Sequence, residues 1–148
     1  MQVLLDTNIL LRWVDTSDPD SAQVIAAVEH LLASGGVLCY TSQNLGEFWN
    51  VLTRPVDRNG YGLSATGANR RARIIESRIQ LIPDTPAVHI EWRNMLVAHN
   101  VCGSQVHDAP LAAAMRVNGI QRILTLNTRD FARFSGIQAL HPTQVAKP

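Results

Sequence analysis

Short apolar segments that alternate with longer amphipathic segments constrain the fold of this chain more than any other feature. The short segments are typical of buried strands, and the longer ones carry apolar residues at helical spacing. Strands that alternate with helices predict an α/β fold with a parallel sheet. We expect strands at 3–5, 37–40, 80–82, 120–126 and 137–140, and helices at 7–14, 21–33, 42–54, 64–77, 88–99 and 108–118.

The length of the chain favours a single domain over 1–148, because 148 residues can bury one core. Ser42 and Ser64 are the expected N-caps of the helices that follow them. The sequence has no long apolar run and no basic N-terminal region. We therefore expect neither a membrane span nor a signal peptide, and a cytoplasmic location by default.

Parallel sheets bind ligands beyond the carboxyl ends of their strands, which directs attention to Asp6 and Asp130. Asp6 directly follows the first expected strand, and Asp130 follows the fourth, shortly after Thr125 and Asn127. Each acid also has a plainer interpretation. Asp6 is a suitable N-cap for the next helix, and Asp130 is a suitable first-turn acid stabilised by a helix dipole.

Two further acids lie on expected helices. Glu47 shares a polar stripe with Asn44 and Arg54. Such a stripe is usually a solvated face, but its short amide side chains slightly favour a functional site. Asp108 opens an Ala-rich helix, either as a plain N-cap or as a carboxylate that the helix N-terminus helps to keep ionised.

The four acids are informative in combination, and we call Asp6, Glu47, Asp108 and Asp130 the acidic set. All four could converge at one edge of a parallel sheet, although sequence spacing alone leaves this open. Mg²⁺ and Mn²⁺ prefer hard oxygen ligands. Two-metal sites need carboxylates that bridge or flank the ions.

The formal net charge of +1 gives no indication of nucleic-acid binding, so any RNA contact must come from local charge. Arg is frequent, and the only lysine is Lys147. This bias suits phosphate contact, although genome composition is the plainer explanation. The candidates are Arg54 and the cluster formed by Arg70, Arg71 and Arg73.

Four segments resemble the PIN domain, in particular the VapC-type ribonuclease toxins. They are LDTNIL at 5–10, NLGEFWNVLTRP at 44–55, VHDA at 106–109 and LTLNTRDF at 124–131. They span nearly the whole chain in the family's order. The resemblance implies a three-layer α/β/α fold with a short central parallel sheet.

The resemblance also implies roles for individual residues. The acidic set would be both catalytic and metal-binding, with Asp6 and Asp108 as direct ligands and Glu47 as a ligand or a partner through water. Asn8, Thr125 and Asn127 match supporting polar residues, and Arg54 is an added candidate for substrate contact. The family often has Asp where this chain has Asn127, which leaves open whether Asn127 or Asp130 faces the metal.

The implied activity is hydrolysis of RNA phosphodiester bonds that depends on Mg²⁺ or Mn²⁺, with in-line attack by an activated water. The implied partners are a second copy of the chain, in a homodimer, and a small VapB-like antitoxin whose tail blocks the active-site groove. Two alternatives stay open. One is a PIN nuclease of RNA processing outside toxin–antitoxin systems, and the other is a PIN-fold module that binds RNA or protein without catalysis.

Other enzyme classes fit the sequence less well. Aspartyl-phosphate phosphatases and receiver domains need a lysine in the core, whereas Lys147 lies at the tail. The sequence contains no Gly-rich phosphate loop and no HExxH zinc pair.

Overall fold

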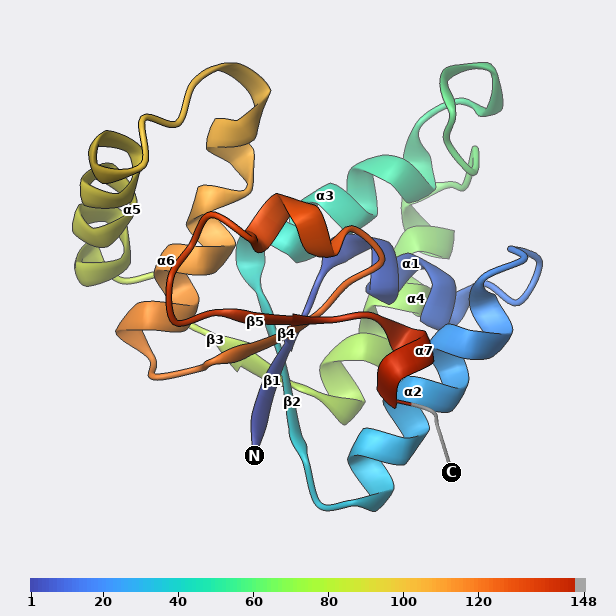
Figure 1. The fold of residues 1–148 in the computed structure, drawn as a ribbon. Helices are drawn as coiled ribbons and strands as arrows, with labels where there is room; N and C mark the ends of the chain where they lie inside the picture. Colours follow the sequence, from blue (N-terminus) through green and yellow to red (C-terminus); the bar gives the residue numbers. More distant parts are fainter. Residues whose placement is uncertain (146–148) are drawn as a thin grey trace.

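The computed structural model describes residues 1–145 and contains a five-stranded sheet in the order β3-β2-β1-β4-β5 (Figure 1). The strands are β1 (Gln2–Leu5), β2 (Val37–Thr41), β3 (Gln80–Ile82), β4 (Arg122–Leu124) and β5 (Gln138–Leu140). All neighbouring strands are parallel, which confirms the expected α/β class. Because β1 is central, the residue after it lies in the middle of one edge of the sheet.

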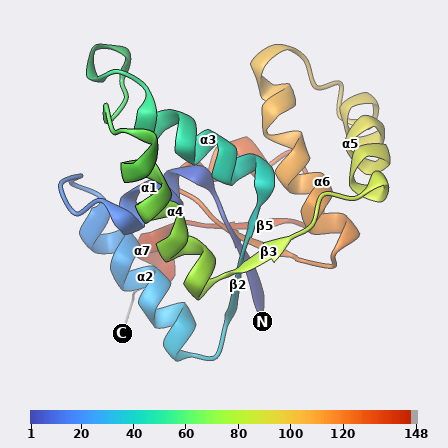
Figure 2. The same cartoon turned by 180° about the vertical axis from the view of Figure 1, so that it is seen from behind.

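Helices cover both faces of the sheet, as the two opposite views show (Figures 1 and 2). The helices are α1 (Thr7–Val14), α2 (Ser21–Ala33), α3 (Ser42–Thr53), α4 (Ala65–Arg78), α5 (Pro86–Ala98), α6 (Ala109–Val117) and α7 (Pro142–Val145). Short 3-10 helices η1 (Val56–Arg58), η2 (Gly103–His107) and η3 (Thr128–Phe131) lie between them. Within residues 1–145, none of the helices combines the length and the apolar character needed to cross a membrane.

The side chains of β1 alternate between two hydrophobic cores. Val3 and Leu5 pack with buried residues of α1 to α4, whereas Leu4 packs with buried residues of α5 and α6. This alternation follows from the two-residue period of a strand. Two cores on opposite faces of one sheet form the three-layer α/β/α arrangement expected from the resemblance.

Two local expectations need correction. The fourth strand is shorter at both ends than the expected 120–126. The Ile120 N–H donates to the Met115 carbonyl at the end of α6, and the Leu126 N–H donates to the Asn8 side chain instead of a neighbouring strand. Thr41, and not Ser42, is the N-cap of α3, since Thr41 and Asn44 form a reciprocal capping box. The expected cap at Ser64 is confirmed, because its hydroxyl accepts a hydrogen bond from the Gly67 N–H at 3.1 Å.

Candidate active site

Asp6 lies where β1 ends, and its carboxylate accepts hydrogen bonds from three different groups. Its Oδ1 accepts from the Thr7 N–H at 2.7 Å. Its Oδ2 accepts from Thr125 Oγ1 at 2.6 Å and from Asn8 Nδ2 at 2.9 Å. The bond from Thr7 makes Asp6 the N-cap of α1, as the plainer interpretation expected. The other two bonds are not needed for capping and fix the plane of the carboxylate.

Burial raises the pKa of Asp6 above its ordinary value. The hydrogen bonds from Thr125, Thr7 and Asn8 lower this pKa, while the negative charge of Glu47 raises it, and the net direction is upward. The site therefore holds the Asp6 carboxylate in a fixed orientation in surroundings that disfavour its negative charge. A bound cation would reduce the free-energy cost of keeping Asp6 ionised.

Asn8 and Thr125 join the ends of β1 and β4 around Asp6. The Asn8 side chain accepts from the Leu126 N–H at 3.2 Å and approaches Thr125 Oγ1 at 3.4 Å through its amide nitrogen. The hydroxyl of the fully buried Thr125 also accepts from the Asn127 N–H at 3.0 Å. The structure thus brings Asn8 and Thr125 into direct contact with Asp6. Asn127 contributes to this network through its backbone.

Glu47 is exposed on α3 and is held from two sides. Its Oε2 accepts from Thr7 Oγ1 at 2.9 Å, and its Oε1 accepts from Gln43 Nε2 at 3.2 Å. Gln43 Nε2 also lies 3.4 Å from the carbonyl oxygen of His107, the residue before Asp108. Sequence reasoning missed both Thr7 and Gln43. The position of Gln43 four residues before Glu47, on the same face of the helix, is the signal that could have identified it.

Asp108 immediately precedes α6 and is half-buried. Its side chain makes no capping hydrogen bond, so interpretation as a plain N-cap is not supported. Burial raises the pKa of Asp108, and the negative charges of Asp130, Asp6 and Glu47 raise it further, while Arg133 lowers it. The other three members of the acidic set therefore lie close enough to Asp108 to raise its pKa. Arg133 is a further neighbour that the sequence did not identify.

Asp130 lies in η3 and is exposed. It sits in a single 3-10 turn, which gives little support to the expected stabilisation by an α-helix dipole. Of the two residues left open by the sequence, Asp130 carries the charge that acts on Asp108. Asn127 precedes η3, and its side chain makes no capping hydrogen bond.

Two residues of the polar stripe on α3 have structural contacts. Asn44 is fully buried, donates to the Leu5 carbonyl at 2.6 Å and accepts from the Thr41 N–H at 2.7 Å. Its amide therefore fixes the end of β1, and its interpretation as part of a ligand-facing stripe is wrong. Arg54 ends α3, and its Nη2 donates to the Asn59 carbonyl at 3.0 Å, which ties it to the loop after α3.

The donor chemistry of the site fits a largely hydrated divalent ion. Among residues 1–145, no three His, Cys, Asp or Glu side chains are close enough to form a complete metal-binding group. Mg²⁺ commonly takes only one or two carboxylates and completes its shell with water and substrate phosphate. The acidic set supplies hard oxygen donors, and the pKa of both Asp6 and Asp108 is raised. The arrangement suits such an ion better than a closed cage.

The family model for the PIN domain matches residues 3–137. No curated protein sequence matches the chain. Among solved structures, VapBC2 of Rickettsia felis bound to promoter DNA aligns with a TM-score of 0.68 at 16% identity, covering 95% of this chain and 98% of that one.

Two further structures share the fold. VapBC-1 of nontypeable Haemophilus influenzae aligns with a TM-score of 0.66 at 16% identity and covers 97% of this chain and 99% of its own. VapC20 of Mycobacterium tuberculosis, a toxin that cleaves the sarcin-ricin loop, aligns with a TM-score of 0.61 at 24% identity, over 82% of this chain and 86% of its own. At these identities the similarity is one of fold.

Proposed function

Because the chain belongs to the PIN domain family, we propose that it is a ribonuclease that hydrolyses RNA phosphodiester bonds with a divalent ion, Mg²⁺ or Mn²⁺. The observation that carries this proposal is that Asp6, at the carboxyl end of β1, lies with Glu47 and Asp130 close enough to Asp108 to raise its pKa. Parallel α/β sheets bind their ligands at this edge. Clustered carboxylates that repel one another are suited to a cation and, with it, to a phosphate.

In this function, Asp6 and Asp108 hold the ion directly, Glu47 holds it directly or through water, and Asp130 completes the negative surface. The ion, when bound, stabilises the charge that develops on the phosphate oxygens and promotes attack by water. Thr125 and Asn8 orient Asp6 through their hydrogen bonds to its Oδ2.

Thr7 and Gln43 act as positioning residues for Glu47. Thr7 donates to one oxygen of its carboxylate and Gln43 to the other. Since Glu47 is otherwise exposed, these two bonds restrict the conformations of a side chain that would be flexible without them. Orientation before substrate arrives reduces the reorganisation needed during reaction.

As the toxin of a VapBC-type pair, the protein would form a homodimer and bind a small VapB-like antitoxin. The support for the antitoxin partner is the similarity of fold to the VapBC proteins of Rickettsia felis and Haemophilus influenzae. An Arg or Lys of the antitoxin would pair with Asp6 and Asp108 and compete with the metal. A neighbouring small gene that encodes a DNA-binding antitoxin is expected, and RNA as substrate makes the cytoplasm the expected compartment. We treat 1–148 as one nuclease domain.

Cleavage of RNA by the purified protein tests the activity. Total RNA or a structured oligoribonucleotide should be cut with Mg²⁺ or Mn²⁺ and remain intact with EDTA. Restoring metal after EDTA should restore cleavage. Cleavage at the same rate in EDTA would exclude a divalent ion, and intact RNA under every metal condition would favour the non-catalytic alternative.

A further inference from the structure

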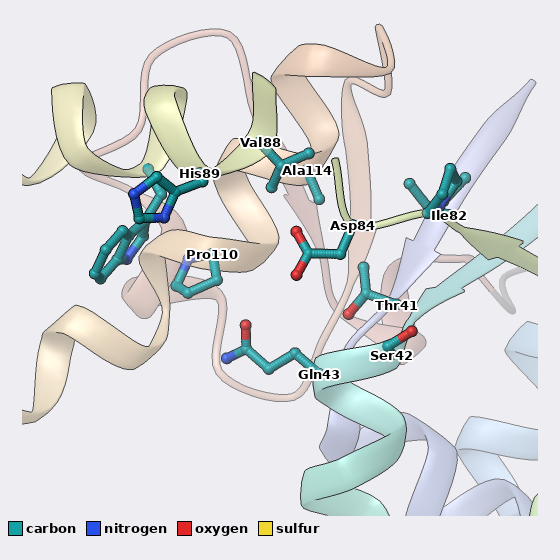
Figure 3. A pocket seen from close by; sticks show the side chains of 11 residues that line it. Thr41, Ser42, Gln43, Ile82, Asp84, Val88, His89, Pro110 and Ala114 are labelled. Atoms are coloured by element: carbon teal, nitrogen blue, oxygen red, sulfur yellow. The ribbon is translucent and has the colours of Figure 1, made fainter. Parts of the chain in front are cut away.

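A pocket of about 200 Å³ lies next to the acidic set, between α3, α5 and α6 (Figure 3). Its walls include the carboxyl ends of β2 and β3 and the first turns of α3 and α6. Its volume is below the usual range for drug-sized ligands, so it suits one small ring system. The lining residues that matter here are Ser42, Gln43, Asp84, His89, Trp92 and Pro110.

Gln43 forms a wall shared by the pocket and the acidic set. Its Nε2 lies 3.2 Å from Glu47 Oε1 and 3.4 Å from the His107 carbonyl oxygen. A polymer bound with a phosphate at the acidic set would therefore pass directly beside the pocket. The next nucleotide along the strand is the part of the polymer within closest reach of it.

The aromatic side of the pocket suits a flat ligand. The rings of His89 and Trp92 have centroids 5.7 Å apart and are tilted by 41°. Trp92 Nε1 lies 3.4 Å from the Val106 carbonyl oxygen, and this hydrogen bond orients the indole. Aromatic side chains bind unpaired bases by stacking on their faces.

The polar side of the pocket presents hydrogen-bond acceptors. Figure 3 shows the Asp84 carboxylate and the Gln43 amide projecting into the space near Pro110. The amide nitrogen of Gln43 is engaged by Glu47 and His107, which leaves its oxygen for a ligand. A carboxylate and an amide oxygen select a base that offers N–H donors.

We infer that this pocket is a subsite for one unpaired nucleobase of the RNA, and that it prefers guanine. Guanine presents adjacent N1–H and N2 amino donors, which match the two oxygens of the Asp84 carboxylate. Uracil offers a single N–H between two carbonyl oxygens, and those oxygens are repelled by a carboxylate. This inference rests on the proposed function, since the base belongs to the RNA that the acidic set would cut.

Nucleotide binding tests the pocket without requiring catalysis. GMP and UMP are titrated into metal-free protein while NMR follows the indole N–H of Trp92. GMP should shift this signal at lower concentration than UMP, and Asp84→Asn should weaken GMP binding at least roughly fivefold. Asp57→Asn, which makes the same change at an exposed position on η1, should leave GMP binding unchanged.

Cleavage specificity tests the same pocket during turnover. Oligoribonucleotides that differ only in one base beside the cut site should be cut roughly five- to hundredfold faster with guanine than with uracil. This ratio should fall toward one in Asp84→Asn and persist in Asp57→Asn. A ratio that is the same in wild type and Asp84→Asn would overturn the guanine subsite.

Other outcomes separate the subsite from the activity. GMP binding at Trp92 without any RNA cleavage would keep the base pocket and remove the proposed ribonuclease. No shift of Trp92 with GMP would overturn the pocket even if RNA is cut. A larger shift with arginine amide than with GMP would overturn it in favour of a peptide side chain that pairs with Asp84.

Discussion

Replacement of Thr125 by valine removes one hydroxyl from the centre of the site with little change of shape. That hydroxyl donates to Asp6 Oδ2 at 2.6 Å and accepts from the Asn127 N–H at 3.0 Å. Thr125 is fully buried, so water cannot readily take the place of its hydroxyl beside Asp6. The variant therefore isolates the contribution of this network to stability and to the state of Asp6.

The expected loss can be built from its parts. A hydrogen bond to a charged group contributes about 1.5–3 kcal/mol. The N–H of the exposed Asn127 adds little to the loss, because water can replace its partner. Thr125→Val should therefore lower the free energy of unfolding by about 1.5–3 kcal/mol at neutral pH. For a chain of this size, that corresponds to a decrease of roughly 3–12 °C in Tm.

The loss should depend on pH in a defined direction. Removal of the Thr125 donor raises the folded pKa of Asp6 further above its ordinary value. A carboxyl pKa that is higher in the folded than in the unfolded protein lowers the free energy of unfolding at pH above the folded pKa. This loss of stability disappears as pH falls through the folded pKa and the carboxyl becomes protonated in both the folded and the unfolded protein. The difference between variant and wild type should thus be largest at neutral pH. It should decrease in acid toward the roughly 1 kcal/mol of a neutral hydrogen bond.

Urea denaturation of metal-free protein across this pH range measures the effect. Thr125→Ser is the matched control, because it keeps the hydroxyl and loses only a methyl group, at a cost of about 1 kcal/mol. A difference of under about 0.5 kcal/mol between Thr125→Val and wild type would refute the reasoning. A loss that is equal at neutral and acid pH would separate Thr125 from the charge of Asp6.

Further substitutions at Asp108, Arg54, Gly60 and Gly46 test other parts of the structure. Asp108→Asn should raise the unfolding free energy in EDTA at neutral pH by on the order of 0.5 kcal/mol, because it removes one repelling charge. This gain should shrink as pH falls through the raised pKa of Asp108. In melting curves, Mg²⁺ should stabilise the variant less than wild type. Arg54→Ala should weaken RNA binding in filter-binding assays and reduce the dependence of RNA affinity on salt concentration. Arg54→Lys should keep that salt dependence. An unchanged salt dependence in the Ala variant would restrict Arg54 to anchoring the loop after α3. Gly60→Ala should lower the free energy of unfolding by at least about 2 kcal/mol, because the new Cβ would lie 1.9 Å from the Arg54 carbonyl oxygen. Gly46→Ala meets no atom within 4 Å and should stabilise α3 by about 0.5–1 kcal/mol. Urea denaturation measures both effects.

Several features of the fold could be predicted from residue patterns in the sequence. The alternation of Val3, Leu4 and Leu5 between two cores is the two-residue period of a buried strand. Asp6 could be placed at the edge of the sheet because it directly follows that strand. Asp130 could be placed in the same way, whereas Glu47 and Asp108 lie on expected helices and became candidates mainly through the resemblance to the PIN domain.

Other features depend on which side chain reaches which partner, and one-dimensional spacing does not contain that information. Ser42 and Thr41 are both good caps, and Thr41 is the cap because Asn44 reciprocates its hydrogen bond. Asn44 has the spacing of a polar face, yet it is buried against the Leu5 carbonyl. The spacing of Gln43 and Glu47 indicates that they share a helix face, but only the fold shows that Gln43 also reaches the His107 carbonyl oxygen, from a segment far along the chain.

The base pocket could not be predicted from the sequence, because only the fold brings its lining residues together. Gln43, Asp84, Trp92 and Pro110 come from separate segments, and none of them belongs to a recognisable motif. Each residue taken alone has an ordinary interpretation as a surface or packing residue. Only the arrangement of α3, α5 and α6 at one edge of the sheet makes them neighbours (Figure 3).

Single-turnover cleavage of RNA by Asp6→Asn in saturating Mg²⁺ tests the central claim most directly. Asparagine keeps the size of the side chain and a capping oxygen for Thr7, so circular dichroism and Tm should show a folded protein. The rate should fall by at least roughly a hundredfold, since the best-oriented oxygen donor of the site loses its charge. Asp57→Asn should cut at the wild-type rate. Cleavage by folded Asp6→Asn at the rate of wild type would contradict the assignment of the acidic set as the active site.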